Sequence, residues 1–195
     1  DEFTNWYTHS VDLNKGNMTF AGVADNKFKY SLADGKPVEF RKGQDVSLKN
    51  GGTVTLTSNL DLGTGGFIFD ENNTYKVEGG EYTFKGAGVN VGKGSTVEWN
   101  VKGDPSDNLH KIGEGTLRVN VAQGNNLKTG NGTVELNAEK SFNQIYLASG
   151  ASKVKLLNQN GLNVDNKFNG VYFTRRGGNL DVNGFSQTFE RIAAS

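Results

Sequence analysis

Apolar residues in this chain recur as pairs separated by one polar residue, and Gly, Asn or Asp divides most of the pairs. The pairs follow one another about every seven residues between positions 46 and 99, and about every nine after Leu109. The first series is Val46/Leu48, Val54/Leu56, Leu60/Leu62, Phe67/Phe69, Tyr75/Val77, Tyr82/Phe84, Val89/Val91 and Val97/Trp99. This alternation is typical of short strands with one buried face.

Short strands at even spacing are compatible with a sandwich, a barrel or a β-solenoid. The turns are too short for Greek-key crossings. Three strands take about 22 residues in the first series and about 27 in the second, which suits one coil of a solenoid. The sequence therefore predicts an all-β fold, a parallel β-helix with three strands per coil, and the alternative is a β-sandwich. No segment has a convincing helical period.

The first fifty residues are less regular than the rest. Three short alternating triplets, at 18–20, 28–30 and 38–40, are separated by glycines. We expect residues 1–49 to form an irregular N-terminal β segment or cap and residues 50–195 to form the solenoid. Trp6 and Tyr7 lie outside any alternation, so we expect them to cap the rod or to contact a missing neighbour.

Composition narrows the functional classes. Lys plus Arg and Asp plus Glu number 21 each, so the net charge is zero and gives no electrostatic argument for nucleic acid or an anionic membrane as partner. The absence of Cys excludes disulfides, thiolate metal sites and a cysteine nucleophile. No signal peptide is visible, and no apolar run is long enough for a transmembrane helix.

Few residues are candidates for chemistry. His9 and His110 have no partner at a metal-ligand spacing, so we expect exposed turn residues rather than bases or zinc ligands. The segment Ser149–Ser152 lacks the surroundings of a serine nucleophile and reads as a turn. Residues 70–73 (Asp-Glu-Asn-Asn) lack the spacing of a calcium loop, and we expect them to form a solvated turn. We therefore predict no catalytic, cofactor-binding or metal-binding residue, and no cofactor.

One alternative stays open from these residues. Some solenoids that cleave polysaccharides carry clustered Asp and Arg on one face, and Asp61, Asp70 and the pair Arg175-Arg176 could form such a groove only if they converge.

The aromatic residues of the first series, Phe67 to Trp99, alternate with polar residues and are expected in the core.

Asparagines at strand ends are expected to have structural roles. They are Asn100, Asn120, Asn137 and Asn183. Asn tolerates a left-handed backbone, and stacked Asn side chains can hydrogen-bond between coils.

Two motifs carry a resemblance to a known family. The stretch 108–120 reads Asn-Leu-His-Lys-Ile-Gly-Glu-Gly-Thr-Leu-Arg-Val-Asn, and the stretch 171–184 reads Val-Tyr-Phe-Thr-Arg-Arg-Gly-Gly-Asn-Leu-Asp-Val-Asn-Gly. In this order they resemble the passenger region of serine protease autotransporters, the group that includes the IgA proteases. The resemblance covers about residues 50–192 and implies a right-handed parallel β-helix.

The resemblance also implies a division of labour. In that family a separate trypsin-like domain upstream does the cleaving, and its Gly-Asp-Ser-Gly motif is absent here, as is the C-terminal membrane barrel. We therefore expect a non-catalytic stalk that presents the protease, supports secretion and lies outside a Gram-negative cell. Its expected partners are those two domains of the same polypeptide. The alternatives are an adhesin that contacts a host surface protein or matrix, and a carbohydrate-active solenoid.

Overall fold

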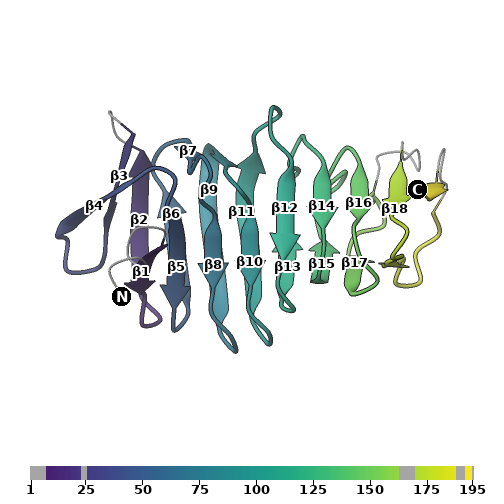
Figure 1. Cartoon of the computed structure of the whole chain (residues 1–195), viewed down its shortest axis with the longest axis horizontal. Helices are drawn as coiled ribbons and strands as arrows, with labels where there is room; N and C mark the ends of the chain where they lie inside the picture. The colour runs from purple at the N-terminus through teal and green to yellow at the C-terminus, as the bar shows by residue number, and fades with distance from the viewer. Residues whose placement is uncertain (1–7, 23–25, 163–169, 188–191, 195) are drawn as a thin grey trace.

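The protein is a rod of stacked coils (Figure 1). The computed structural model describes residues 8–22, 26–162, 170–187 and 192–194, and every regular element within these ranges is a β-strand. Most of the strands belong to two sheets that run along the rod, which we name sheet A and sheet B. Nothing in the described ranges is a helix of the length and apolarity needed to cross a membrane.

Sheet A has nine strands, each hydrogen-bonded in parallel to the next. In spatial order they are β1 (Thr8–Asp12), β5 (Asp45–Lys49), β8 (Phe67–Phe69), β10 (Val89–Val91), β12 (Leu109–Ile112), β14 (Leu127–Thr129), β16 (Ile145–Leu147), β18 (Val171–Phe173) and β20 (Ile192–Ala194). This order follows the chain, so each coil adds one strand to the growing edge.

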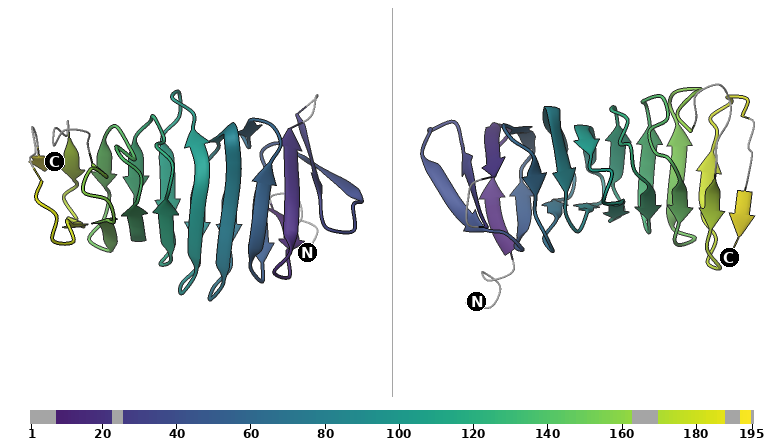
Figure 2. Two further views of the ribbon diagram at one scale, coloured as in Figure 1. Left: turned by 180° about the vertical axis from the view of Figure 1, so that it is seen from behind. Right: turned by 90° about the horizontal axis from the view of Figure 1, so that it is seen from above.

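Sheet B has eleven strands and is parallel except at its N-terminal end. Its path is β4 (Pro37–Arg41), β3 (Lys27–Ser31), β2 (Asn17–Gly22), β6 (Gly52–Leu56), β9 (Thr74–Lys85), β11 (Thr96–Gly103), β13 (Thr116–Val119), β15 (Gly132–Leu136), β17 (Ser152–Leu156) and β19 (Asn179–Asp181), and β7 (Leu60–Asp61) pairs with β9. The antiparallel hairpin β3–β4 lies at one end of the rod (Figure 2).

The third side of the coil is regular only in the early coils. There β7 pairs with the far end of β9, which in turn pairs with the far end of β11. Later coils replace this side with loops that still bond from coil to coil, as when the Gln123 amide donates to the Ser141 carbonyl at 2.9 Å and the Ser141 amide to Gly161 at 2.9 Å. The parallel β-helix is thus confirmed, with a third side that changes along the rod.

Coil length follows the state of this third side. Val46, Phe67 and Val89 are successive partners in sheet A, at intervals of 21 and 22 residues, as the first series predicts. Leu117, Val134 and Val154 are successive partners in sheet B at intervals of only 17 and 20, so the 27-residue coil is wrong there. Each of these coils consists of two strands and a short loop. Two repeats of about nine residues, rather than three, therefore complete one coil.

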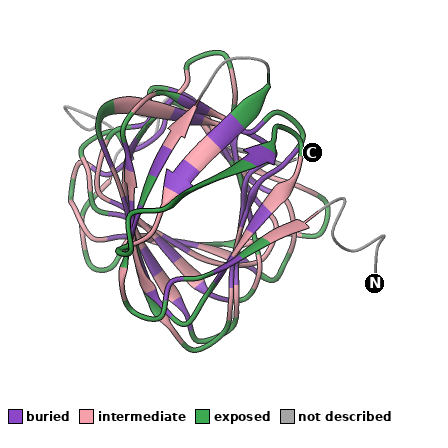
Figure 3. Ribbon diagram, turned by 90° about the vertical axis from the view of Figure 1, so that its left-hand side faces the viewer, coloured by how far each residue is buried: buried purple, intermediate pink, exposed green. Residues whose placement is uncertain are grey.

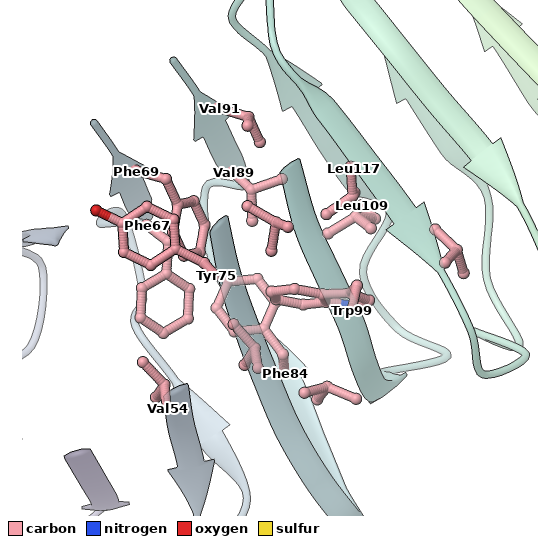
Figure 4. Close-up of a cluster of buried hydrophobic side chains, with 14 of the residues drawn as sticks. Val54, Phe67, Phe69, Tyr75, Phe84, Val89, Val91, Trp99, Leu109 and Leu117 are labelled. Carbon is pink, nitrogen blue, oxygen red and sulfur yellow. The ribbon is translucent and has the colours of Figure 1, made fainter. Parts of the chain in front are cut away.

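The core lies inside the coils. Along most strands, such as β11, β15 and β17, buried residues alternate with half-buried or exposed ones (Figure 3), and the buried apolar residues form one core. Aromatic rings fill the early coils (Figure 4): Phe84 meets Trp99 edge to face at 5.3 Å between centroids and stacks on Phe67 at 5.4 Å. Phe69 and Tyr75 are also buried, and Tyr82 packs against the core, so the prediction of core aromatics is confirmed.

The N-terminal end has its own aromatic cluster. His9 stacks on Phe40 at 5.0 Å between centroids, and its Nε2 lies 2.8 Å from the Tyr30 hydroxyl. Phe20 meets Phe40 edge to face at 5.5 Å. The strands β1 and β2 already pair in parallel with the next coil. A boundary near residue 49 stays a prediction, and Trp6 and Tyr7 lie outside the described residues.

Candidate functional site

The two histidines occupy strands rather than turns. His9 is half-buried in β1 within the aromatic cluster, so the expectation of an exposed turn residue is wrong for it. Burial lowers its pKa below the usual value. His110 is exposed, but it lies on β12 and faces outward between Leu109 and Lys111, whose side chains face inward. The described residues contain no group of three or more His, Asp or Glu that could hold a metal ion, and the absence of a metal site at either histidine stays a prediction.

The residues of the open polysaccharide groove do not converge. Asp61 is on the third side, 3.0 Å from the Lys42 ammonium, whereas Asp70 bonds the Tyr75 hydroxyl at the end of β8. Arg175 follows β18, five strand spacings from β8 in sheet A, or roughly 24 Å. Partial burial alone would raise the pKa of Asp61, but hydrogen bonds from Lys42 and from the Gly63 amide lower it below its usual value. Asp61 is therefore an ionised, paired carboxylate.

The two segments predicted as turns are turns. The Ser149 hydroxyl donates to the Gly130 carbonyl, and the Ser152 hydroxyl donates to the Ser149 carbonyl, so both oxygens serve the backbone. Residues 70–73 form the corner between β8 and β9, where Asn72 has a left-handed φ of 59°. The two serine hydroxyls therefore stabilise a corner of the coil.

Lys111 is the residue that the sequence interpretation missed. It lies on β12, faces the interior of the coil and is completely buried. Its Nζ donates to the carbonyls of Gly113 and Gly115 at 2.6 Å each and to that of Asn131 at 2.7 Å. Burial lowers its pKa to about 8, while three acceptors match the three hydrogens of the ammonium. The side chain ties a corner of one coil to the corner of the next.

A row of alternating charges runs along the outer face of sheet B, and we call it the charge row. Parallel register places its six members in adjacent coils. They are Lys76, Glu98, Arg118, Glu135, Lys155 and Asp181. Each charge therefore has opposite charges as its neighbours on the strands beside it, which favours the observed register.

Arg118 is the best-connected member of the charge row. Its guanidinium bonds Glu98 on one side, and its Nη2 lies 3.0 Å from Glu135 on the other. Burial would lower its pKa, but the hydrogen bond and charge of Glu135 and the charge of Glu98 raise it further. Arg118 is thus a permanent cation that clamps three coils.

Asparagines extend the same seam, as the sequence predicts. The Asn120 amide donates to Glu98 at 2.7 Å, and Asn137 donates to the Asn120 side chain at 2.9 Å. Asn183 has a left-handed φ of 51°. Asn100 has neither feature; it lies on β11 beside Glu78. Two of these asparagines therefore add hydrogen bonds between coils.

Comparisons with known proteins identify the fold and the family. No family model matches the chain. The serine protease EspC of Escherichia coli O127:H6 is 44% identical over 194 residues, which is 98% of this chain and 14% of that protein. The chain thus spans about one seventh of the length of this curated relative.

Two solved structures agree. The crystal structure of the passenger domain of plasmid encoded toxin, an autotransporter enterotoxin from enteroaggregative Escherichia coli, superposes with a TM-score of 0.81 at 44% identity and covers 99% of this chain and 19% of its own. The Haemophilus influenzae Hap adhesin gives a TM-score of 0.79 at 25% identity, over 94% of this chain and 24% of its own. By sequence and by fold, the chain belongs to the passenger β-helix of the serine protease autotransporter family.

Proposed function

We propose that the chain is a non-catalytic section of stalk that presents a protease domain and supports secretion. The observation that carries this proposal is the unbroken parallel ladder of sheet A from β1 to β20, wrapped around one continuous core. Such a rod would hold the domains at its two ends apart from each other. The parent polypeptide would carry a trypsin-like serine protease domain upstream and a membrane barrel downstream.

Membership in the passenger family also gives the location. The chain is secreted or displayed on the surface of a Gram-negative bacterium. Each coil contacts mainly its neighbours, so the rod can fold one coil at a time as it leaves the cell. The exposed edge of each finished coil offers unpaired backbone groups to the next. Progressive folding of this kind would favour outward movement of the chain.

The first test is to read the gene on both sides of this segment. A domain with Gly-Asp-Ser-Gly upstream and a barrel downstream would support the proposal. A barrel without a protease would refute the presenting role and leave the rod itself as the functional surface.

The second test removes one coil from the full-length protein. Deleting residues 117–133 joins Thr116 to Val134, which occupies the position of Leu117 in the next coil, so the inward and outward faces keep their phase. The matched control deletes 117–134 and joins Thr116 to Glu135. In the joined strand, residues that faced inward then face outward, and residues that faced outward face inward. We expect the first variant to be secreted and to cleave a peptide normally, and the control to be retained. Loss of cleavage by a secreted, folded first variant would contradict a passive stalk.

A second candidate function is attachment to a host surface. The observation that favours it is the similarity to the Hap adhesin. A purified rod that binds cultured epithelial cells or immobilised matrix in a saturable manner would support this function. Binding no greater than that of an unrelated β-solenoid would count against it.

A further inference from the structure

The outer face of sheet A changes character in the second half of the rod. Register places His110, Lys128, Tyr146 and Tyr172 at one outward position of β12, β14, β16 and β18. These strands lie side by side in Figure 1. At about 4.8 Å per strand the row extends over roughly 14 Å. It therefore forms a flat strip parallel to the axis of the rod.

The two tyrosines form a stacked pair. Their ring centroids are 4.8 Å apart and their planes differ by 13°. The Tyr172 ring also lies over Gly170, where an added Cβ would meet the ring at 2.6 Å. Stacking covers one face of each ring, and the half-exposed pair presents its edges and hydroxyls to solvent. The Tyr146 hydroxyl lies 2.9 Å from Gln144 Oε1, and the Tyr172 hydroxyl has no partner among the described residues.

A shallow depression of about 480 Å³ lies beside the turn that follows β18 and carries two exposed arginines. It is lined by Ala148, Thr174, Arg175 and Arg176. Both arginines are exposed, and neither has an ion pair or hydrogen bond within the described ranges. The Thr174 hydroxyl is shielded and also lacks a partner. The depression thus offers unsatisfied donors at the end of the strand that carries Tyr172.

Within the described part of the chain, the charge on this face is uncompensated, unlike the charge on sheet B. The strands β14, β16 and β18 and the turns that follow them contain Lys128, Arg175 and Arg176 and, in the described residues, no Asp or Glu. In the charge row, by contrast, each Lys or Arg is followed by a carboxylate. A protein of zero net charge has therefore left one face cationic, which favours an anionic ligand.

We propose that this face binds a linear sulfated polysaccharide, and we name it the Tyr–Arg face: Lys128, Tyr146, Tyr172, Thr174, Arg175 and Arg176. Guanidinium groups hold sulfate with paired hydrogen bonds, and tyrosine hydroxyls can exchange hydrogen bonds with sugar hydroxyls. A flat strip along the rod suits an extended chain. Single-stranded nucleic acid fits less well, because bases stack on open aromatic faces and the stacking of the two tyrosines already covers one face of each ring. The inference rests on the second candidate function, attachment.

The test uses the full chain and a heparin octasaccharide in titration calorimetry at about 0.15 M salt. The variant Arg175→Gln/Arg176→Gln is compared with Lys153→Gln/Lys155→Gln, which removes the same charge from the outer face of sheet B. We expect at least a tenfold loss of affinity in the first variant and less than a twofold change in the second. Tyr172→Phe should weaken binding severalfold without changing the salt dependence.

Three results would overturn the inference. They are equal losses in both double variants, no binding of the octasaccharide by the wild-type chain, and equally tight binding of an oligonucleotide of the same charge. Secretion of the parent carrying Arg175→Gln/Arg176→Gln separates this test from the stalk proposal. Normal secretion with lost binding supports the binding face, and failed secretion would assign these arginines to folding instead. If cells still attach to the rod although the octasaccharide does not bind, the proposal of attachment stands and the proposal of a sulfated polysaccharide as the ligand is refuted.

Discussion

Replacing Lys111 with methionine removes the one charged side chain of the described core. Methionine has a similar length and no branch, so the interior stays filled. What disappears is the ammonium that joins the carbonyls of Gly113, Gly115 and Asn131. The Gly115 carbonyl keeps the Thr133 amide at 3.1 Å, whereas the other two have no second partner among the described residues.

The magnitude follows from opposing contributions. Hydrogen bonds to a charged group stabilise by about 1.5–3 kcal/mol each, so three contribute roughly 5–9 kcal/mol. A pKa lowered to about 8 corresponds to a burial cost of roughly 3 kcal/mol for the cation. Methionine regains about 1–2 kcal/mol through apolar burial. The difference of these contributions lies between about 0 and 5 kcal/mol, so we expect Lys111→Met to lower the free energy of unfolding by about 2–3 kcal/mol, near the middle of that range.

Urea denaturation followed by tryptophan fluorescence measures this change, since Trp99 lies in a neighbouring coil of the core. The control is Lys128→Met, which removes an exposed lysine from the next strand and should change stability by less than about 0.5 kcal/mol. A Lys111→Met variant as stable as the wild type would refute the reasoning that the three carbonyls need this donor.

The same residue gives a pH dependence of defined sign. Its pKa is about 8 in the folded chain and near 10.5 when exposed, so between these values the unfolded chain binds more protons. Stability from this group therefore rises with pH across that window and is constant below it. The destabilisation caused by Lys111→Met should grow by about 2 kcal/mol between about pH 7.5 and 9.5. A difference that shrinks over this range would contradict the lowered pKa.

Three further changes test the packing of the rod. Trp99→Ala should destabilise by about 3–5 kcal/mol in urea titrations, because the fully buried indole leaves a cavity against the neighbouring rings. Arg118→Glu places a carboxylate between Glu98 and Glu135 and should cost about 1–3 kcal/mol, less in about 1 M salt; a loss that does not respond to salt would contradict the charge row. Gly88→Ala should lower the melting temperature by several degrees, because φ is +131° and the added Cβ would meet the His110 carbonyl at 2.3 Å; an unchanged melting temperature would show that this corner can move.

The alternation of apolar and polar residues was enough to predict the architecture. A period of two marks inward and outward faces in any strand, and stacking requires similar residues at equivalent positions, so the core aromatics could be assigned. Coil length was harder to predict. The nine-residue beat was multiplied by three strands, although the structure makes Leu117 and Val134 partners only 17 residues apart. A loop that is held by backbone hydrogen bonds needs no alternation of apolar and polar residues, so the sequence gives no periodic signal for it.

The side-chain contacts between coils could not be predicted from the sequence either, because they depend on coil lengths that follow no fixed period. No apolar pattern marks Lys111 as buried, and lysine rarely lies in a core, so only its three carbonyl partners explain its position. The charge row spans intervals that vary between 17 and 26 residues, so no fixed period aligns it. The Tyr146–Tyr172 pair likewise becomes visible only when the 26-residue step between them is known.

The alternation of the charge row limits how the length of such a rod can change during evolution. Loss of a single coil, such as the one that carries Arg118, brings Glu98 beside Glu135. Loss of two successive coils instead brings Glu98 beside Lys155, and the signs still match. Gain or loss of repeats in even numbers therefore preserves the electrostatic pattern. Recombination within such genes is expected to leave rods that differ by pairs of coils.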